Sequence, residues 1–141
     1  MKRVLVVAYD FPPSAGVGTF RTLRFVRHLG QFGWQPSVLT VADATRGRED
    51  PALLGQVPTE VPVHRTSSGE PALLLRRFVT RAGLGKFSQY ADRLAMFLGL
   101  WMVPDGQIPW RRAALFVAWQ MLREEEYQAI YTTSSPYTAH L

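Results

Sequence analysis

The sequence predicts an α/β protein with a doubly wound parallel sheet, and three observations lead to that prediction. Val4–Ala8 is a continuous apolar run rich in β-branched residues, the kind that is buried on both faces of a parallel sheet. A helical pattern then separates this run from a second apolar run, Ser37–Val41. A strand, a helix and a strand within about 40 residues form a βαβ unit, which favours parallel strands and a right-handed crossover.

The composition fits one domain and narrows the range of functions. The 141 residues are 47% hydrophobic and 19% charged, as in an ordinary globular protein. With no cysteine, disulfides and thiolate metal sites are excluded. The net charge is +5, carried mostly by arginine, which suits phosphates, anionic lipids or nucleic acid but is equally compatible with a solvated surface. Because no basic-aromatic interleaving or recognition motif is present, we expect no nucleic-acid partner.

The first helix is expected to begin at Phe20, with Thr19 as its N-cap, and to end at Gly33. Its basic residues fall on one side, and the apolar residues that recur with helical spacing form the expected buried stripe, namely Phe25, Val26, Leu29 and Phe32.

The middle of the chain is expected to hold a long loop, an edge strand and two helices. Ala42–Thr59 is polar and rich in glycine and proline, as functional or disordered loops are. Val61–Arg65 reads as a short strand whose proline suits a sheet edge. Glu70–Arg81 and Lys86–Val103 have helical spacing.

The last third predicts a further helix and a fourth strand. Pro109 suits the first turn of a helix that frays at the acidic run 124–126, with a core stripe of Trp110, Ala114, Val117 and Met121. Ala129–Thr133 is the fourth strand, and Ser134–Pro136 resembles a helix start. Since the chain ends after one further turn, the sequence is expected to be a single domain, 1–141, that is truncated after its fourth strand.

The loop Phe11–Gly18 is the strongest candidate site. It follows the first strand and opens the first helix, where ligands bind in open α/β sheets and where helix amides attract anions. The alternative is a structural turn. A Walker loop is absent, and Arg21 stands where a dinucleotide fingerprint has its third glycine. Asp43 is the ribose-binding acid that an NAD(P)-binding domain would need, which leaves that function as a weaker alternative.

Three blocks together resemble the amino-terminal domain of family 4-type glycosyltransferases, which have the two-domain GT-B architecture. The blocks are Tyr9–Gly18 with Arg21 and Gly33–Thr40, Pro104–Asp105 with Trp110 and Ala114, and Ile130–Pro136 with His140. The chain departs from the family pattern at Ala15, where relatives have glycine, and at Tyr137, where relatives have proline.

The resemblance implies two Rossmann-like domains facing across a cleft, with this chain as the acceptor side and a carboxyl-terminal, donor-binding domain missing. It implies sugar transfer with retention from a nucleotide-sugar, without a metal or other cofactor. Gly16, Val17, Gly18 and Arg21 would bind the donor phosphates, because helix amides stabilise the negative charge that develops on the leaving group. No catalytic residue is assigned, and the chain alone is expected to be inactive.

The acceptor would be a glycan or a lipid-linked sugar, as in polysaccharide biosynthesis. Asp105, Ser134, Ser135 and His140 are its candidate ligands. Turn formation is the alternative for Asp105, helix capping for the two serines, and packing for His140.

A cytoplasmic location is expected, with contact to the inner face of the membrane as a further expectation. No apolar run reaches the roughly 20 residues that a membrane span needs. Leu73–Arg81 combines apolar and basic residues, so it suits either an anionic membrane surface or an ordinary core helix. The chain could instead be the non-catalytic half of a split transferase, or a partner-binding module.

Overall fold

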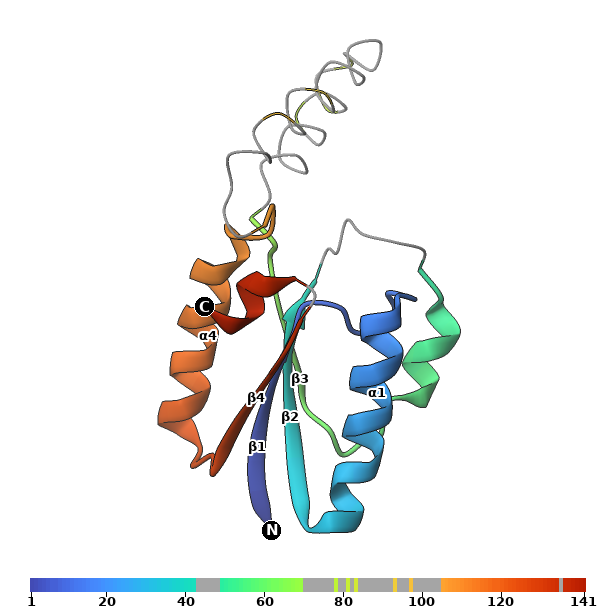
Figure 1. Ribbon diagram of the computed structural model, residues 1–141, viewed down its shortest axis with the longest axis vertical. Helices are drawn as coiled ribbons and strands as arrows, with labels where there is room; N and C mark the ends of the chain where they lie inside the picture. The colour runs from blue at the N-terminus through green and yellow to red at the C-terminus, as the bar shows by residue number, and fades with distance from the viewer. Residues whose placement is uncertain are drawn as a thin grey trace.

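The computed structural model describes residues 1–42, 49–69, 105–134 and 136–141, together with the single positions 78, 81, 83, 93 and 97. Four strands are formed in this part of the chain: β1 (Lys2–Ala8), β2 (Trp34–Val41), β3 (Val63–Thr66) and β4 (Ala129–Thr133). Two α-helices accompany them, α1 (Val17–Leu29) and α4 (Trp110–Glu124) (Figure 1). Three short 3₁₀ helices complete the described elements: η1 (Gly30–Phe32), η2 (Pro51–Gln56) and η4 (Tyr137–His140).

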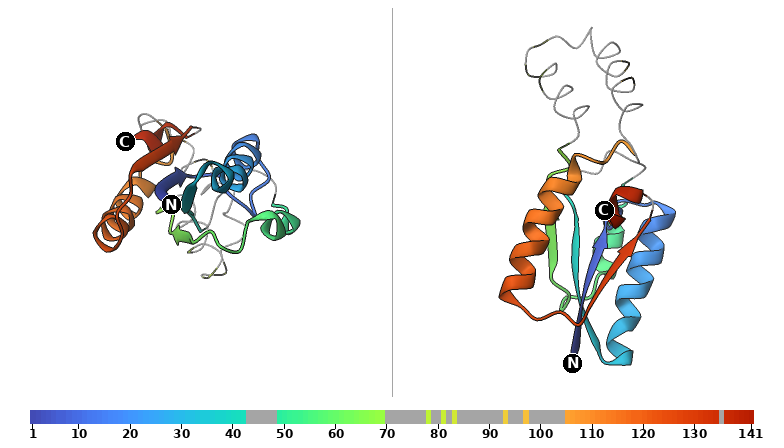
Figure 2. Two further views of the ribbon diagram at one scale, coloured as in Figure 1. Left: turned by 90° about the horizontal axis from the view of Figure 1, so that it is seen from below. Right: turned by 60° about the vertical axis from the view of Figure 1, so that its left-hand side comes forward.

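The four strands form one parallel sheet in the order β3-β2-β1-β4. Residue Val6 of β1 pairs with Val38 of β2 on one side and with Tyr131 of β4 on the other. Helix α1 and η2 lie on one face of the sheet, and α4 lies on the opposite face (Figures 1 and 2). The α/β fold with a parallel sheet is therefore confirmed, and the strand order agrees with the first four strands of the common doubly wound fold.

Alternating residues of the strands build a separate core on each face. Val4 and Val6 of β1 point toward α1 and pack with Val26 of that helix. Leu5 and Tyr9 point toward α4, where they join a cluster with Trp110, Ala114 and Met121. Burying each large apolar side chain contributes about 1.5–3 kcal/mol, so the two-sided β1 strand is the main stabilising element.

The first helix differs from the sequence-based expectation in its start and in its buried face. Gly16, with φ −92° and ψ 166°, is the N-cap, so Thr19 as the N-cap was wrong. The buried stripe consists of Thr19, Thr22, Leu23 and Val26. Phe25 and Phe32 were wrong as core residues, since they are 39% and 76% exposed. The buried face is therefore rotated around the helix axis from the predicted one. The prediction missed it because Thr19 and Thr22 count as polar, although both side chains face inward.

The α-helix also ends earlier than expected, at Leu29, and the 3₁₀ turn η1 continues it to Phe32. Gly33 has φ +77° and ends η1, a conformation that favours glycine. Most other elements were predicted at the right place. Strand β3 is confirmed as an edge, and α4 buries most of the stripe expected for it. Part of the predicted loop 42–59 is in fact η2, with Pro51 in its first turn and the Asp50 carboxylate accepting from the amide of Ala52 at 3.0 Å.

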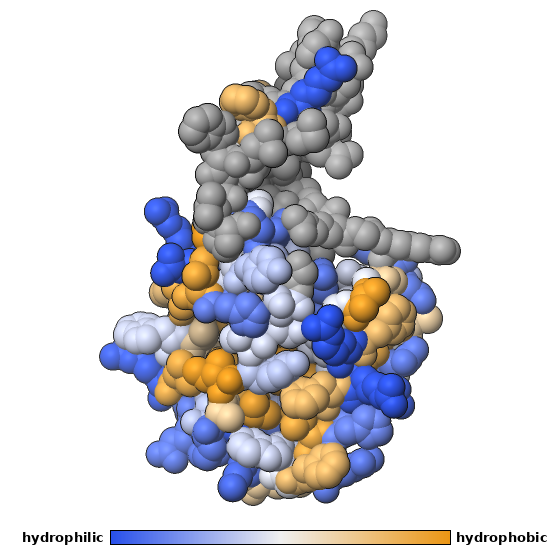
Figure 3. Space-filling model, in the orientation of Figure 1, coloured by the Kyte–Doolittle hydropathy of each residue, from blue (hydrophilic) through white to orange (hydrophobic). Residues whose placement is uncertain are grey.

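The end of the described chain forms a short helical turn, η4. The helix start expected at Ser134–Pro136 is the 3₁₀ turn η4, whose N-cap is Pro136, so the predicted cap position was wrong. The predicted helices Glu70–Arg81 and Lys86–Val103 lie outside the continuously described residues. Figure 3 shows hydrophobic patches on the surface where β4 faces the viewer.

Candidate functional site

The candidate site lies where β1 and β4 end side by side. The chain leaves β1 toward α1 on one face of the sheet, whereas β4 is reached from α4 on the other face (Figure 1). This reversal is the switch point at which open α/β sheets bind their ligands. The loop after β1, the first turn of α1 and Ser134 after β4 are the parts that meet there.

Among the described residues, the first turn of α1 presents amide groups without a capping side chain. No side-chain hydrogen bond caps Gly16, and the turn carries no acidic residue in the described structure. The Thr19 hydroxyl is fully buried, and it has no hydrogen-bond partner among the described residues. The first amides of a helix have no partner within the helix and carry partial positive charge, so this turn can accept an anion.

The two glycines of the loop have different physical roles. A side chain at Gly16 would meet no atom within 4 Å, and the backbone there is extended, so the protein itself does not require glycine at this position. A Cβ on Gly18 would lie 3.3 Å from the carboxylate of Asp10. Gly18 is therefore explained by packing against Asp10, whereas the space over Gly16 is open to a ligand.

Three hydrogen bonds from elsewhere in the chain hold the loop after β1. The amide of Asp50 donates to the Pro13 carbonyl at 2.7 Å, and the Thr40 hydroxyl donates to the Tyr9 carbonyl at 3.0 Å. The Arg65 guanidinium donates to the Pro12 carbonyl and also reaches the Val41 carbonyl at 3.4 Å. The Pro12–Pro13 bond in this loop is cis.

Arg65 holds the loop, although no sequence pattern pointed to this role. Partial burial lowers the pKa of its guanidinium from the ordinary value, but the group stays charged because an arginine pKa is so high. Its partner, the Pro12 carbonyl, lies 53 residues earlier. The only available signal was an arginine on an edge strand, which is common on solvent-facing surfaces.

Arg21, predicted to bind the phosphates of the sugar donor, and Ser134, predicted to bind the sugar acceptor, lie next to each other. Arg21 Nη1 donates to the Ser134 carbonyl oxygen at 3.1 Å. The bond joins α1 to the end of β4 and keeps the guanidinium at the switch point. The predicted role of the Ser134 side chain is separate from this contact, which uses its backbone, and Ser135 lies outside the described residues.

Asp105 is occupied by hydrogen bonds from its own turn and from η4. Its carboxylate accepts from the Gln107 amide at 3.1 Å, from the Thr138 amide at 2.9 Å, and from the Thr138 hydroxyl. Burial alone would raise the pKa of Asp105, but the hydrogen bonds from Thr138, Gln107 and Tyr137 outweigh it and lower the pKa. The carboxylate does for η4 what a capping side chain does for an α-helix.

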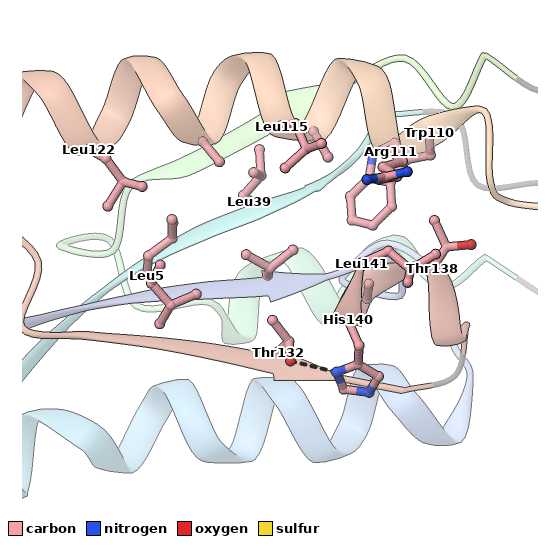
Figure 4. A pocket seen from close by; sticks show the side chains of 15 residues that line it. Leu5, Leu39, Trp110, Arg111, Leu115, Leu122, Thr132, Thr138, His140 and Leu141 are labelled. Carbon is pink, nitrogen blue, oxygen red and sulfur yellow. Dashed lines mark hydrogen bonds between the residues drawn. The ribbon is translucent and has the colours of Figure 1, made fainter. Parts of the chain in front are cut away.

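His140 lies on the other side of β4 from Arg21. Its Nδ1 and the Thr132 hydroxyl are 2.6 Å apart, as the dashed line in Figure 4 marks. Both residues line an apolar cavity of about 200 Å³ between the sheet, α4 and η4. The structure thus brings Arg21 and Ser134 together at one place, whereas His140 faces a different, apolar space.

The described residues lack two other kinds of feature. They contain no group of three or more His, Cys, Asp or Glu side chains arranged to hold a metal ion. No helix within them has the length and hydrophobicity to cross a membrane. The segment Leu73–Arg81, expected to be either a membrane contact or a core helix, and Asp43, the alternative ribose ligand, lie outside the continuously described part.

Comparison of the chain with models of known protein families, with curated proteins and with solved structures gave no match.

Proposed function

We propose that this chain is the acceptor-side, amino-terminal part of a retaining glycosyltransferase of the GT-B type. In this proposal the first turn of α1 binds the phosphates of a nucleotide-sugar, and the sugar is moved to a glycan or a lipid-linked acceptor. The chain alone has no transferase activity, because the larger part of the donor site would be on a second domain.

One observation carries the proposal. The first turn of α1, which no side chain of the described residues caps, lies at the switch point of the sheet, and a Cβ on Gly16 would meet no atom within 4 Å. Backbone amides fixed in this way stabilise negative charge on a departing phosphate without reorganising during the reaction. The loop that carries them is held by hydrogen bonds from Thr40, Asp50 and Arg65, so its geometry is set before a ligand arrives.

Arg21 adds a fixed positive charge to this turn. Its bond to the Ser134 carbonyl uses one nitrogen, and the remaining N–H groups of the guanidinium are available to a phosphate. The Asp10 carboxylate, which lies against Gly18, is a negative charge that a bound phosphate would also meet at this turn. Asp105 is assigned a positioning role in this proposal, because η4 already engages its carboxylate.

The test uses opposite effects of one substitution on stability and on binding. Gly16→Asp puts a favoured N-cap residue on α1, so the chain should unfold at the same or a higher temperature. The same carboxylate repels phosphates, so affinity for pyrophosphate should fall about tenfold or more. Gly16→Asn is the matched neutral control, which caps the helix equally well and should retain most of the binding.

Binding is measured by amide chemical shifts on titration with inorganic pyrophosphate, UDP-glucose and NAD⁺. We expect shifts at residues 16–18 with the first two compounds. The proposal is wrong if neither compound moves these amides, or if Gly16→Asp binds as well as Gly16→Asn. Preferential binding of NAD⁺ would support the dinucleotide-binding alternative. Sugar transfer by the purified chain would contradict the proposal that the chain alone has no transferase activity.

A further inference from the structure

The side of α4 that faces away from the sheet carries a stripe of aromatic and basic residues. Each member of this stripe follows a residue of the core stripe by two positions, which is about 200° around an α-helix. The four members are exposed and form the outer stripe of α4, namely Arg112, Phe116, Trp119 and Arg123. Because residues three and four apart are neighbours on a helix, their side chains cover one continuous strip.

The two aromatic side chains of the outer stripe are large apolar groups in contact with water. Phe116 is 61% exposed and Trp119 is 53% exposed. The Arg123 guanidinium lies over the Trp119 ring, with its Cζ 3.9 Å from the ring centroid. Tryptophan with an apolar ring and a polar N–H suits the boundary between water and lipid, and arginine keeps its charge at that boundary while its stem covers apolar surface.

The charge along the outer stripe is positive. Arg112 and Arg123 stand on either side of the two rings, and the stripe has no acidic member. Glu124 and Glu125 follow at the end of the helix, where Glu125 pairs with Arg3 at 3.2 Å. Arginines next to exposed aromatic rings are attracted by the negative phosphates of an anionic lipid surface.

The outer stripe would remain surface if the sheet continued beyond β4. No described element lies on the outer side of α4 (Figures 1 and 2). A doubly wound fold has one layer of helices on each face of its sheet, so a further crossover helix would pack beside α4, over the groove lined by Leu115 and Leu122. A second domain across the switch point would face the carboxyl ends of the strands, and neither would cover Phe116 and Trp119.

We propose that the outer stripe of α4 docks the domain on an anionic lipid bilayer. Phe116 and Trp119 enter the headgroup region, while Arg112 and Arg123 contact the lipid phosphates. Docking does not depend on sugar transfer or on the first turn of α1, so this proposal and the proposed function fail separately.

Charge decides against a second copy of the chain as the occupant. If two α4 helices paired in antiparallel orientation through their outer stripes, Arg112 of one copy would lie opposite Arg123 of the other. In parallel orientation each arginine would lie opposite its own counterpart. Like charges meet in both arrangements and oppose association, whereas lipid phosphates carry the complementary charge.

Flotation of the 141-residue chain with lipid vesicles measures the contact. One preparation is an equimolar mixture of phosphatidylglycerol and phosphatidylcholine, and the other is phosphatidylcholine alone. We expect the affinity for the anionic vesicles to be at least about tenfold higher than that for the neutral ones. Equal affinity for the two preparations, or no binding to either, would overturn the proposal.

Matched substitutions locate the contact on α4. Phe116→Asp and Arg112→Glu should each weaken binding to anionic vesicles by about tenfold or more. Phe32→Asp and Arg27→Glu make the same chemical changes at exposed positions on the α1 face of the sheet, and both should bind nearly as the wild type does. Equal losses in a pair would mean that general charge or another segment, such as Leu73–Arg81, makes the contact.

Tryptophan fluorescence tests whether the stripe reaches the bilayer. Lipids with brominated acyl chains quench a tryptophan that lies close to them. Trp119→Phe keeps an aromatic ring in the stripe, so this variant should still bind, but its fluorescence should be quenched much less than that of the wild type. Undiminished quenching in Trp119→Phe would show that a different part of the chain enters the bilayer and would overturn the proposal.

Discussion

The two edges of the sheet are built differently. Strand β3 has only four residues, follows Pro62, and exposes His64 and Arg65. Strand β4 is an uncharged run with Ile130 outward. The β3 edge has basic residues and a proline just before it, features that keep an edge from pairing, whereas β4 has neither a charged side chain nor a proline within its five residues. The composition of β4 is that of an interior strand, although its neighbour on one side is absent from the described residues.

The difference also shows how each edge contributes to the candidate site. On the β3 side, Arg65 turns its guanidinium inward and holds the loop that precedes Gly16. On the β4 side, Ser134 holds Arg21, and the adjoining surface is open. The β3 side thus holds the loop before α1 in place, whereas the surface beside β4 is apolar and exposed at Ile130.

The largest expected effect compares two tryptophans of α4. Trp110 is fully buried, meets Tyr9 edge-on at 5.2 Å, and donates to the Thr66 hydroxyl of β3 at 2.8 Å. Trp110→Ala should therefore lower the free energy of unfolding by about 3–5 kcal/mol. Trp119 is 53% exposed and stacks under Arg123, so Trp119→Ala should change it by less than about 0.5 kcal/mol.

Urea denaturation followed by circular dichroism measures both variants. Similar losses for the two tryptophans would mean that the exposed end of α4 is packed as firmly as the end against β3. The contrast between the two sides of the sheet would then be lost.

The next effect tests whether the β3 edge supports the candidate site. Arg65→Met keeps much of the side-chain volume but removes the bonds to the Pro12 and Val41 carbonyls. Because hydrogen bonds from charged groups contribute about 1.5–3 kcal/mol, the loss should fall in that range. The exchange of the Ser14 amide, which donates to the Phe11 carbonyl at 3.1 Å, should also accelerate.

Arg27→Met is the control for Arg65→Met, since Arg27 is a solvent-facing arginine of α1 and its loss should be nearly neutral. If both variants lose the same stability, or if Ser14 exchange is unchanged in Arg65→Met, then Arg65 does not hold the loop.

Local patterns predicted the strands and α4 well, because these elements have strong periodicity. The α/β class, the edge position of β3 and the stripe of α4 all followed from runs and spacing near each residue. The phase of α1 did not follow, because Thr19 and Thr22 are buried against the sheet although threonine counts as polar. Hydropathy alone therefore favoured Phe25, which instead covers β4 by stacking on Tyr131.

The candidate site was predictable in position but not in its contacts. A loop between a first strand and a first helix indicates an anion site from sequence alone. The bond from Arg21 to Ser134 and the bonds from Thr138 to Asp105 join residues 113 and 33 positions apart. Such pairs depend on sheet order and register, which local patterns do not contain. The different reasons for Gly16 and Gly18 also required the position of Asp10.

A smaller effect concerns Asp105, which anchors η4 beside the end of β4. Asp105→Asn should cost about 0.5–2 kcal/mol at neutral pH, as the loss of a helix cap does. The folded-state pKa is lowered below the ordinary value of 3.8, so the carboxylate stabilises the fold above that pH. This contribution is lost as pH falls through the folded pKa, and the difference between the wild type and Asp105→Asn should shrink there.

Urea denaturation between pH 7 and pH 2 measures that difference, with Thr138→Val as a second variant. Removing the Thr138 hydroxyl takes away a hydrogen bond that lowers the pKa of Asp105, so this pKa should rise toward 3.8 in the carboxyl NMR titration. A pH-independent difference for Asp105→Asn would show that the charge of the carboxylate does not matter.

The smallest effect on stability gives the most direct comparison of the two edges. Ile130→Lys and His64→Lys place the same charge at exposed positions on β4 and on β3, and each should change the free energy of unfolding by less than about 0.5 kcal/mol. Lysine on an open edge opposes pairing with another strand. Ile130→Lys should therefore slow aggregation on warming, measured by light scattering, whereas His64→Lys should not, because β3 is already protected. Equal slowing by both substitutions would mean that general charge, and not the open β4 edge, controls association.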